Sequence, residues 1–76
     1  MVSLEDVVLM NDALINYYEK SNPKNEKRLL KHEIIRKVLK TENCFNKISK
    51  EDALKILKDI GVHESQTESV YYNIAK

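Results

Sequence analysis

The 76-residue sequence has very few of the residues that make sharp turns. It contains one glycine, Gly61, and one proline, Pro23. A multi-stranded sheet needs turn residues between its strands, so this scarcity argues against a β-rich fold. It also excludes a glycine-rich phosphate-binding loop, which needs several glycines close together in the sequence.

Cysteine and long apolar runs are also scarce. Cys44 is the only cysteine, so no disulfide can form within the chain, and a lone thiol is typical of a reducing, intracellular compartment. The longest apolar run, residues 7–10, is too short to cross a membrane. The first residues lack the basic start and apolar centre of an export signal. The sequence therefore predicts a cytoplasmic protein with no membrane partner.

Residues that carry out catalysis or bind metals are sparse and scattered. The two histidines, His32 and His63, belong to different predicted elements, and neither has a second histidine or a cysteine at metal-ligand spacing. The acidic residues are spread over helix faces, and a chain of this length rarely encloses a substrate pocket. We therefore predict no catalytic residue, no metal, no cofactor and no enzymatic activity.

The residues that are abundant favour a single small helical domain. Hydrophobic residues make up 42% of the chain and charged residues 33%, a balance typical of a folded domain. Apolar residues recur at the spacing of an amphipathic helix in four stretches. The predicted helices cover residues 4–20, 23–41, 50–60 and 66–75, and the predicted fold class is a small all-α four-helix domain.

Each predicted helix has a start signal. Three of them begin with a serine followed three residues later by an acidic residue, the pattern of a capping box. The pairs are Ser3 with Asp6, Ser49 with Asp52, and Ser65 with Glu68. The second helix is expected to begin at Pro23 after an Asn22 cap. Residues 41–48 are predicted to form a loop that Phe45 and Ile48 anchor in the core.

Charge is strongly segregated along the chain, although the net charge is only +1. Residues 1–19 hold four acidic and no basic residues, whereas residues 20–40 hold eight basic and two acidic ones. On the second helix we expect the apolar residues Leu30, Ile34, Ile35, Val38 and Leu39 to face inward. The opposite side would then carry a basic stripe of His32, Arg36 and Lys40, with Lys37 and Lys27 at its flanks. Such a stripe can follow a phosphate backbone or can simply be a solvated face.

The C-terminal part of the chain contains a helix, a glycine turn and a second helix. Gly61 stands where a left-handed helix end is expected, and Val62 can fold back onto Leu57. On these residues, the stretch 49–76 resembles helix-turn-helix DNA-binding proteins, and with residues 31–48 the resemblance extends to a trihelical core. The resemblance implies a small regulatory protein that binds duplex DNA.

The resemblance also implies which residues would touch DNA. The last predicted helix would enter the groove with Gln66, Thr67, Ser69, Tyr72 and Asn73, while His32, Arg36, Lys37 and Lys40 would contact the backbone. An alternative stays open, because Glu64 and Glu68 leave the reading helix with a net negative charge. In that alternative the chain is a helical protein–protein interaction module: an adaptor, an inhibitor or a dimerisation domain.

The first predicted helix has more apolar residues than one face of a small core can bury. We therefore divide the chain into an N-terminal segment, residues 1–22, and a trihelical core, residues 23–76. The N-terminal segment is expected to form a homodimer, with Leu9, Ile15 and Tyr18 in the interface. In the alternative, the other three helices wrap the first helix completely and the protein is a monomer.

Overall fold

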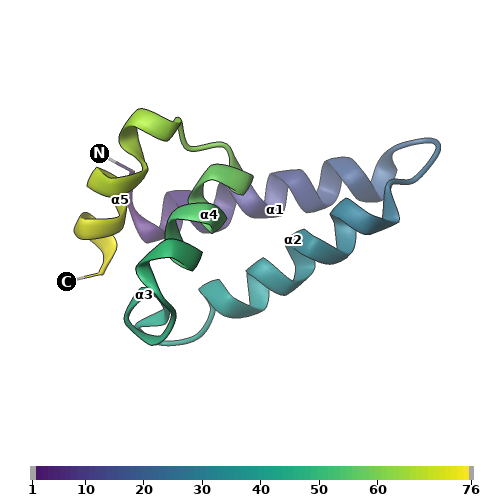
Figure 1. Ribbon diagram of the computed structural model, residues 1–76. Helices are drawn as coiled ribbons and strands as arrows, with labels where there is room; N and C mark the ends of the chain where they lie inside the picture. The colour runs from purple at the N-terminus through teal and green to yellow at the C-terminus, as the bar shows by residue number, and fades with distance from the viewer. Residues whose placement is uncertain (1, 76) are drawn as a thin grey trace.

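The computed structural model describes residues 2–75, and over that range the chain is helical without any strand (Figure 1). This confirms the predicted all-α class. The elements are α1 (Leu4–Lys20), α2 (Glu26–Leu39), α3 (Cys44–Lys47), α4 (Lys50–Ile60), the 3-10 turn η1 (Glu64–Gln66) and α5 (Thr67–Ile74). None of the helices formed by residues 2–75 has both the length and the apolar content that crossing a membrane requires.

Two of the three predicted serine caps are present. The Ser3 hydroxyl accepts a hydrogen bond from the Asp6 N–H, and the Asp6 carboxylate accepts one from the Ser3 N–H. These bonds, led by the one from the Ser3 backbone, lower the pKa of Asp6. Ser49 caps α4 with a single bond, its hydroxyl accepting from the Asp52 N–H at 3.1 Å. These short-range signals set the starts of α1 and α4.

The start of the second helix was predicted wrongly. α2 begins at Glu26 rather than at Pro23, and the Asn25 side chain caps it by accepting from the Arg28 N–H at 3.2 Å. Residues 21–25 form the connection that reverses the chain between α1 and α2, and the Asn22–Pro23 peptide bond within it is cis. Asn22 and Asn25 are the same residue type and cap helices equally well. Because residues 21–25 are needed to reverse the chain, α2 begins only after Asn25.

The third capping box does not form. Residues 64–66 make a 3-10 turn, in which the His63 ring accepts from the Ser65 N–H at 3.2 Å. α5 then starts without a side-chain cap, because Ser65 lies inside the preceding turn instead of one residue before a helix. The Thr67 hydroxyl, which is mostly buried, donates to the Glu64 carbonyl across the junction.

The expected loop at residues 41–48 contains the one-turn helix α3. This turn buries Cys44 and Phe45, and Ile48 packs against the same core, so the predicted anchoring by Phe45 and Ile48 is confirmed. Phe45 is one of the most deeply buried side chains, and its ring stacks on Tyr71 of α5 with 6.1 Å between centroids. α3 therefore connects the α2 end of the molecule to α5.

The five helices form an antiparallel hairpin, α1–α2, with α3, α4 and α5 gathered at its open end (Figure 1). The apolar core lies at that end and draws residues from every α-helix. Its members are Val7, Ile35, Leu39, Cys44, Phe45, Ala53, Leu57, Ile60, Val62 and Val70. Val7 of α1 is fully buried in this cluster, so α1 shares the core of the segment from residue 23 onward.

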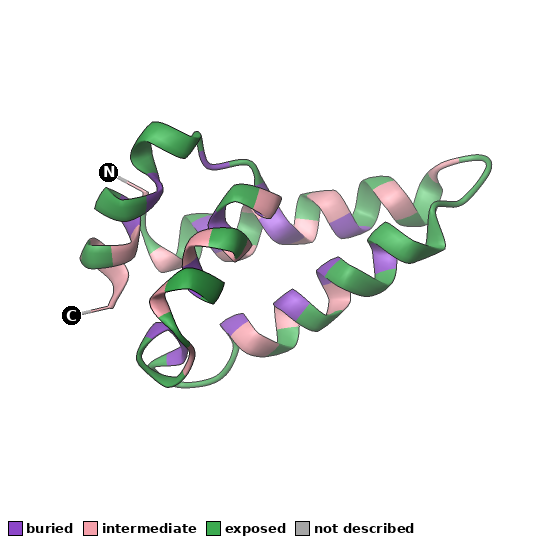
Figure 2. Ribbon diagram, viewed as in Figure 1, coloured by how far each residue is buried: buried purple, intermediate pink, exposed green. Residues whose placement is uncertain are grey.

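The orientation of α2 differs from the sequence-based expectation. Its buried residues are Leu29, His32, Ile35 and Leu39, whereas Leu30 and Ile34 are 59% and 54% exposed. Figure 2 shows buried and exposed positions alternating along α2. The expected inner face was therefore wrong for Leu30 and Ile34. α2 packs mainly against α1 and has little backbone contact with α4, so only one of its two apolar sides is covered.

Candidate functional site

The C-terminal helices form the turn on which a helix-turn-helix depends. Gly61 ends α4 with φ 119°, and its N–H donates to the Lys58 carbonyl while the Val62 N–H donates to the Leu57 carbonyl. This pair of bonds is a Schellman motif, and it needs a positive φ that glycine adopts readily. Val62 and Leu57 are both buried in the core. The predicted helix end at Gly61 is confirmed.

The residues expected to read DNA on α5 are not all available. Gln66, Ser69 and Tyr72 are exposed, but Thr67 is only 7% exposed. Asn73 is half-buried, and its side-chain amide donates to the Val2 carbonyl. Burial of Thr67 follows from its position at the junction of η1 and α5. Three of the five predicted residues thus share an open surface.

The cations near α5 are engaged with side chains of the protein. The Lys50 ammonium donates to the Tyr72 hydroxyl at 2.7 Å and lies 3.6 Å from the Glu68 carboxylate. The bond to Tyr72 is the main reason that the pKa of Lys50 is raised. Lys58 lies 3.8 Å from Glu64 in the same region. These pairs reduce the positive charge that the surface around α5 can offer to a phosphate backbone.

The predicted basic stripe on α2 is interrupted. His32 is only 3% exposed, which corrects the expectation that it lies on the solvent side of α2. Arg36 is half-buried, and Lys37 and Lys40 are exposed. The structure therefore leaves a shorter basic surface towards the end of α2, and His32 faces α1 instead.

His32 forms a buried polar pair with Asn11, which is fully buried on α1. The Asn11 side-chain amide donates to the His32 carbonyl, and its oxygen lies 2.9 Å from His32 Nδ1. Since that oxygen can only accept, Nδ1 carries the proton. Burial, with a further contribution from Lys31, lowers the pKa of His32, and Asp59 opposes the shift. The pair therefore fixes the orientation of the His32 ring, and burial disfavours the charged form of that ring.

The three residues predicted for a dimer interface on α1 have different environments. Leu9 is 66% exposed, whereas Ile15 is 5% exposed, so the expectation that Ile15 offers a contact surface was wrong. Tyr18 is half-buried, with its ring stacked on His32 and its hydroxyl accepting from Arg28. Of the two adjacent tyrosines, Tyr17 is the outward one. Ile15 faces inward because the helical repeat places it on the same side as Val7 and Asn11.

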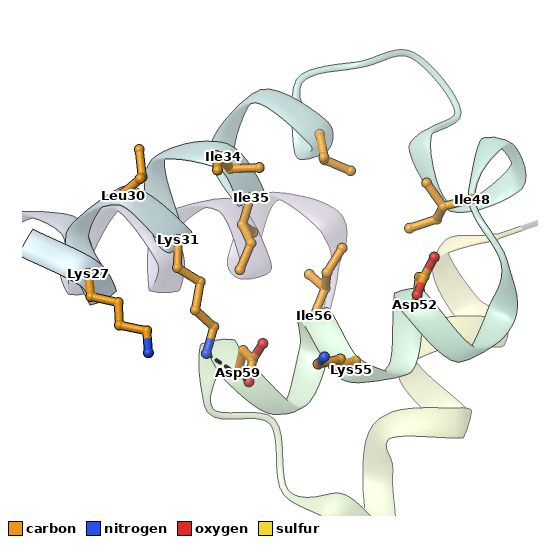
Figure 3. Close-up of a pocket in the computed structure, with 11 residues that line it drawn as sticks. Lys27, Leu30, Lys31, Ile34, Ile35, Ile48, Asp52, Lys55, Ile56 and Asp59 are labelled. Atoms are coloured by element: carbon orange, nitrogen blue, oxygen red, sulfur yellow. Dashed lines mark ion pairs between the residues drawn. The ribbon is translucent and has the colours of Figure 1, made fainter.

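Sequence reasoning missed an open groove of about 570 Å³ between α2 and α4 (Figure 3). Its walls are mostly aliphatic and its edges are charged. The aliphatic residues are Leu30, Ile34, Ile35, Val38, Ile48 and Ile56, and the charged ones are Lys27, Lys31, Lys55, Asp52 and Asp59. The sequence did contain a signal for this groove, because apolar residues occur on two sides of α2. A single neighbouring helix can cover only one of those sides.

The groove has different charges at its two ends. Lys31 pairs with Asp59 at 3.2 Å, which ties the first half of α2 to the end of α4. Lys27 lies one turn earlier on α2 at the same end, while Asp52 lies at the opposite end next to Ile48 (Figure 3). Within residues 2–75, Lys27 and Asp52 take part in no ion pair. The two ends of the groove therefore carry opposite unpaired charges, and Lys55 of α4 lies between them (Figure 3).

The remaining reactive groups are the thiol of Cys44 and the potential metal ligands. Cys44 is a buried free thiol, and burial raises its pKa, so the unreactive protonated form is favoured. Among residues 2–75, no group of three or more His, Cys, Asp or Glu side chains is placed to hold a metal ion.

Comparisons of the chain with protein-family models, curated proteins and solved structures found no match.

Proposed function

We propose that the chain is a small non-enzymatic binding protein that associates with another protein chain through the groove between α2 and α4. The observation that carries this proposal is the exposure of Leu30 and Ile34, one helical turn apart, beside that groove. An intracellular setting is part of the proposal, because the only cysteine is a free buried thiol.

The chemistry of the groove favours a protein partner over a small polar ligand or a nucleic acid. Leaving two large aliphatic side chains in water forgoes roughly 1.5–3 kcal/mol for each one that a partner would bury. Contiguous apolar surface with a charged edge is typical of protein contact sites. A helical partner suits the shape, because side chains one turn apart can enter a groove between two helices.

DNA binding by α5 is a second candidate, favoured by the α4–η1–α5 arrangement. Gln66, Ser69 and Tyr72 are exposed on the helix that would enter the groove of DNA. Glu64 and Glu68 lie on the same surface and pair with the nearest lysines, so phosphate attraction is weak there. For this reason the protein-binding groove is the first candidate.

Site-specific photo-crosslinking tests the groove. A benzophenone side chain is introduced at Leu30 and, as the matched control, at Leu9, which is also apolar and exposed but lies on α1. We expect an adduct from position 30, identified by mass spectrometry as a single protein, and none from position 9. Equal labelling from both positions, or none from position 30, would contradict the proposal.

An anisotropy titration with duplex DNA at two salt concentrations tests the second candidate. Phosphate contact predicts an affinity that falls steeply as salt rises. If DNA binds, Ser69→Glu should weaken it, whereas Asn46→Glu, at an exposed position on α3, should not. Absence of binding at low salt removes the DNA candidate and leaves the groove proposal unaffected.

A further inference from the structure

We infer that the partner in the groove is a second copy of this chain, with the two α2 helices antiparallel across a two-fold axis. This inference rests on the proposed function and names the partner for the same site. It starts from the fact that the groove region contains both a ridge and a hollow. Leu30 and Ile34 form the ridge, and Ile35, Ile48 and Ile56 line the hollow beside it (Figure 3). Val38 also lines the groove.

A surface that contains a ridge and a matching hollow can pair with itself. In a two-fold contact the same patch is used by both chains, so a ridge–hollow contact is made twice. The exposed parts of Leu30 and Ile34 would be covered by the partner's groove, and both hollows would be filled. A small domain buries a thin core, so the added apolar contact stabilises it considerably.

The charges at the groove ends fit an antiparallel pairing. A two-fold axis across α2 brings the Lys27 end of each groove to the Asp52 end of the other. Lys27 and Asp52 both lack an ion-pair partner within residues 2–75, so each is free to pair across the interface. The Lys31–Asp59 pair stays within each copy. A parallel arrangement would instead place the two Lys27 side chains together.

Sedimentation equilibrium over a range of micromolar concentrations tests the pairing. The wild-type chain should reach twice its 8.9 kDa mass as the concentration rises. Ile34→Glu should weaken self-association by at least about tenfold, because pairing would bury an unpartnered carboxylate. Leu9→Glu, the same change at an exposed leucine on α1, should leave the dimer unchanged. Circular dichroism confirms that each variant remains helical.

A charge exchange tests the antiparallel register. Lys27→Glu and Asp52→Lys should each weaken the homodimer by roughly three- to tenfold, because each creates two like-charge contacts. Mixing the two variants should restore association, since every contact in the mixed dimer then joins opposite charges. A Lys37→Glu variant mixed with Asp52→Lys is the matched control, because Lys37 is exposed on α2 but does not line the groove.

These experiments distinguish the homodimer from the more general proposal that the groove binds a protein. A single 8.9 kDa species at every concentration overturns the dimer. If Leu9→Glu abolishes the dimer and Ile34→Glu does not, the α2 interface is also overturned, and the dimer contact lies on α1. In either case, a crosslink from position 30 to an identified different protein keeps the groove as a binding surface. If mixing the charge variants restores nothing, the antiparallel register is wrong.

Discussion

The two halves of the α1–α2 hairpin differ in what holds the helices together. At the open end Val7, Ile35 and Leu39 join an apolar cluster that also contains Phe45 and Leu57. Halfway to the connecting loop, the contact between the helices is the buried Asn11–His32 pair. Ile15 and Leu29, nearer the loop, are buried but lie outside the apolar cluster.

This difference shows how a small domain with a thin core fixes the alignment of two helices. Apolar contacts are non-directional and scale with buried area. A pair of hydrogen bonds between buried groups has strict geometry, and a shift along the helix would leave both groups unsatisfied at a cost of about 1–3 kcal/mol each. The open end therefore supplies most of the stability, while the polar pair selects one register and makes that contact sensitive to pH.

The largest expected effect is the loss of an apolar side chain at the open end. Phe45→Ala should lower the free energy of unfolding by about 3–5 kcal/mol, because Phe45 is 1% exposed and its removal leaves a cavity. Ile15→Ala, at the buried site nearer the loop, should cost less. Urea unfolding followed by circular dichroism measures both, and an equal or larger loss at Ile15 would contradict the contrast between the two halves.

Breaking the polar pair should have an intermediate effect. Asn11→Leu should cost about 1–3 kcal/mol, because the His32 ring loses its buried acceptor. Adding His32→Leu should recover part of this loss, since two apolar side chains then face each other. The coupling comes from a double-mutant cycle measured by urea unfolding. Strictly additive losses would show that the Asn11–His32 bonds contribute no pairwise stability.

The helix end at the apolar half depends on one glycine. Gly61→Ala should cost about 1–2 kcal/mol, because a φ of 119° disfavours a side chain. A Cβ at Gly61 would have no heavy atom within 4 Å apart from its chain neighbours, so the cost comes from the backbone. Asn43→Gly, at the other positive φ within residues 2–75, is the control and should change stability much less. Thermal unfolding measures both.

The smallest expected effect is the pH dependence of the free energy of unfolding. It should arise from His32, in the half of the hairpin that the Asn11–His32 pair holds together. The pKa of His32 lies below its usual 6.5 in the folded state, mainly because of burial. Below pH 6.5 the unfolded chain therefore binds more protons, and stability falls as the pH falls. The loss attributable to His32 is the difference between the wild type and the Asn11→Leu/His32→Leu variant, measured by urea unfolding from pH 7 to pH 5. A difference that does not change with pH would show that His32 is not held neutral.

Local sequence determined most of the helix boundaries. Ser3 and Ser49 each bond to a backbone N–H three residues away, and Gly61 needs only its own positive φ, so these signals act whatever the rest of the chain does. The break in the helical pattern at residues 41–48 predicted the segment that Phe45 anchors in the core. The predicted cap at Asn22 was wrong, because Asn25 caps α2 after the chain reversal. The predicted cap at Ser65 was also wrong, because Ser65 lies inside a 3-10 turn that His63 caps.

Only the tertiary structure decided which side of α2 faces inward. Apolar residues lie on two sides of this helix, and the pattern alone does not say which side α1 will cover. Asn11 decides the matter because it can be buried only if it finds a polar partner, and His32 provides that partner. Burying His32 against α1 leaves Leu30 and Ile34 on the opposite, outer side of α2, beside the groove. α4 has little backbone contact with α2 and does not cover them. The groove therefore follows from a contact between residues 21 positions apart, which no short stretch of the sequence contains.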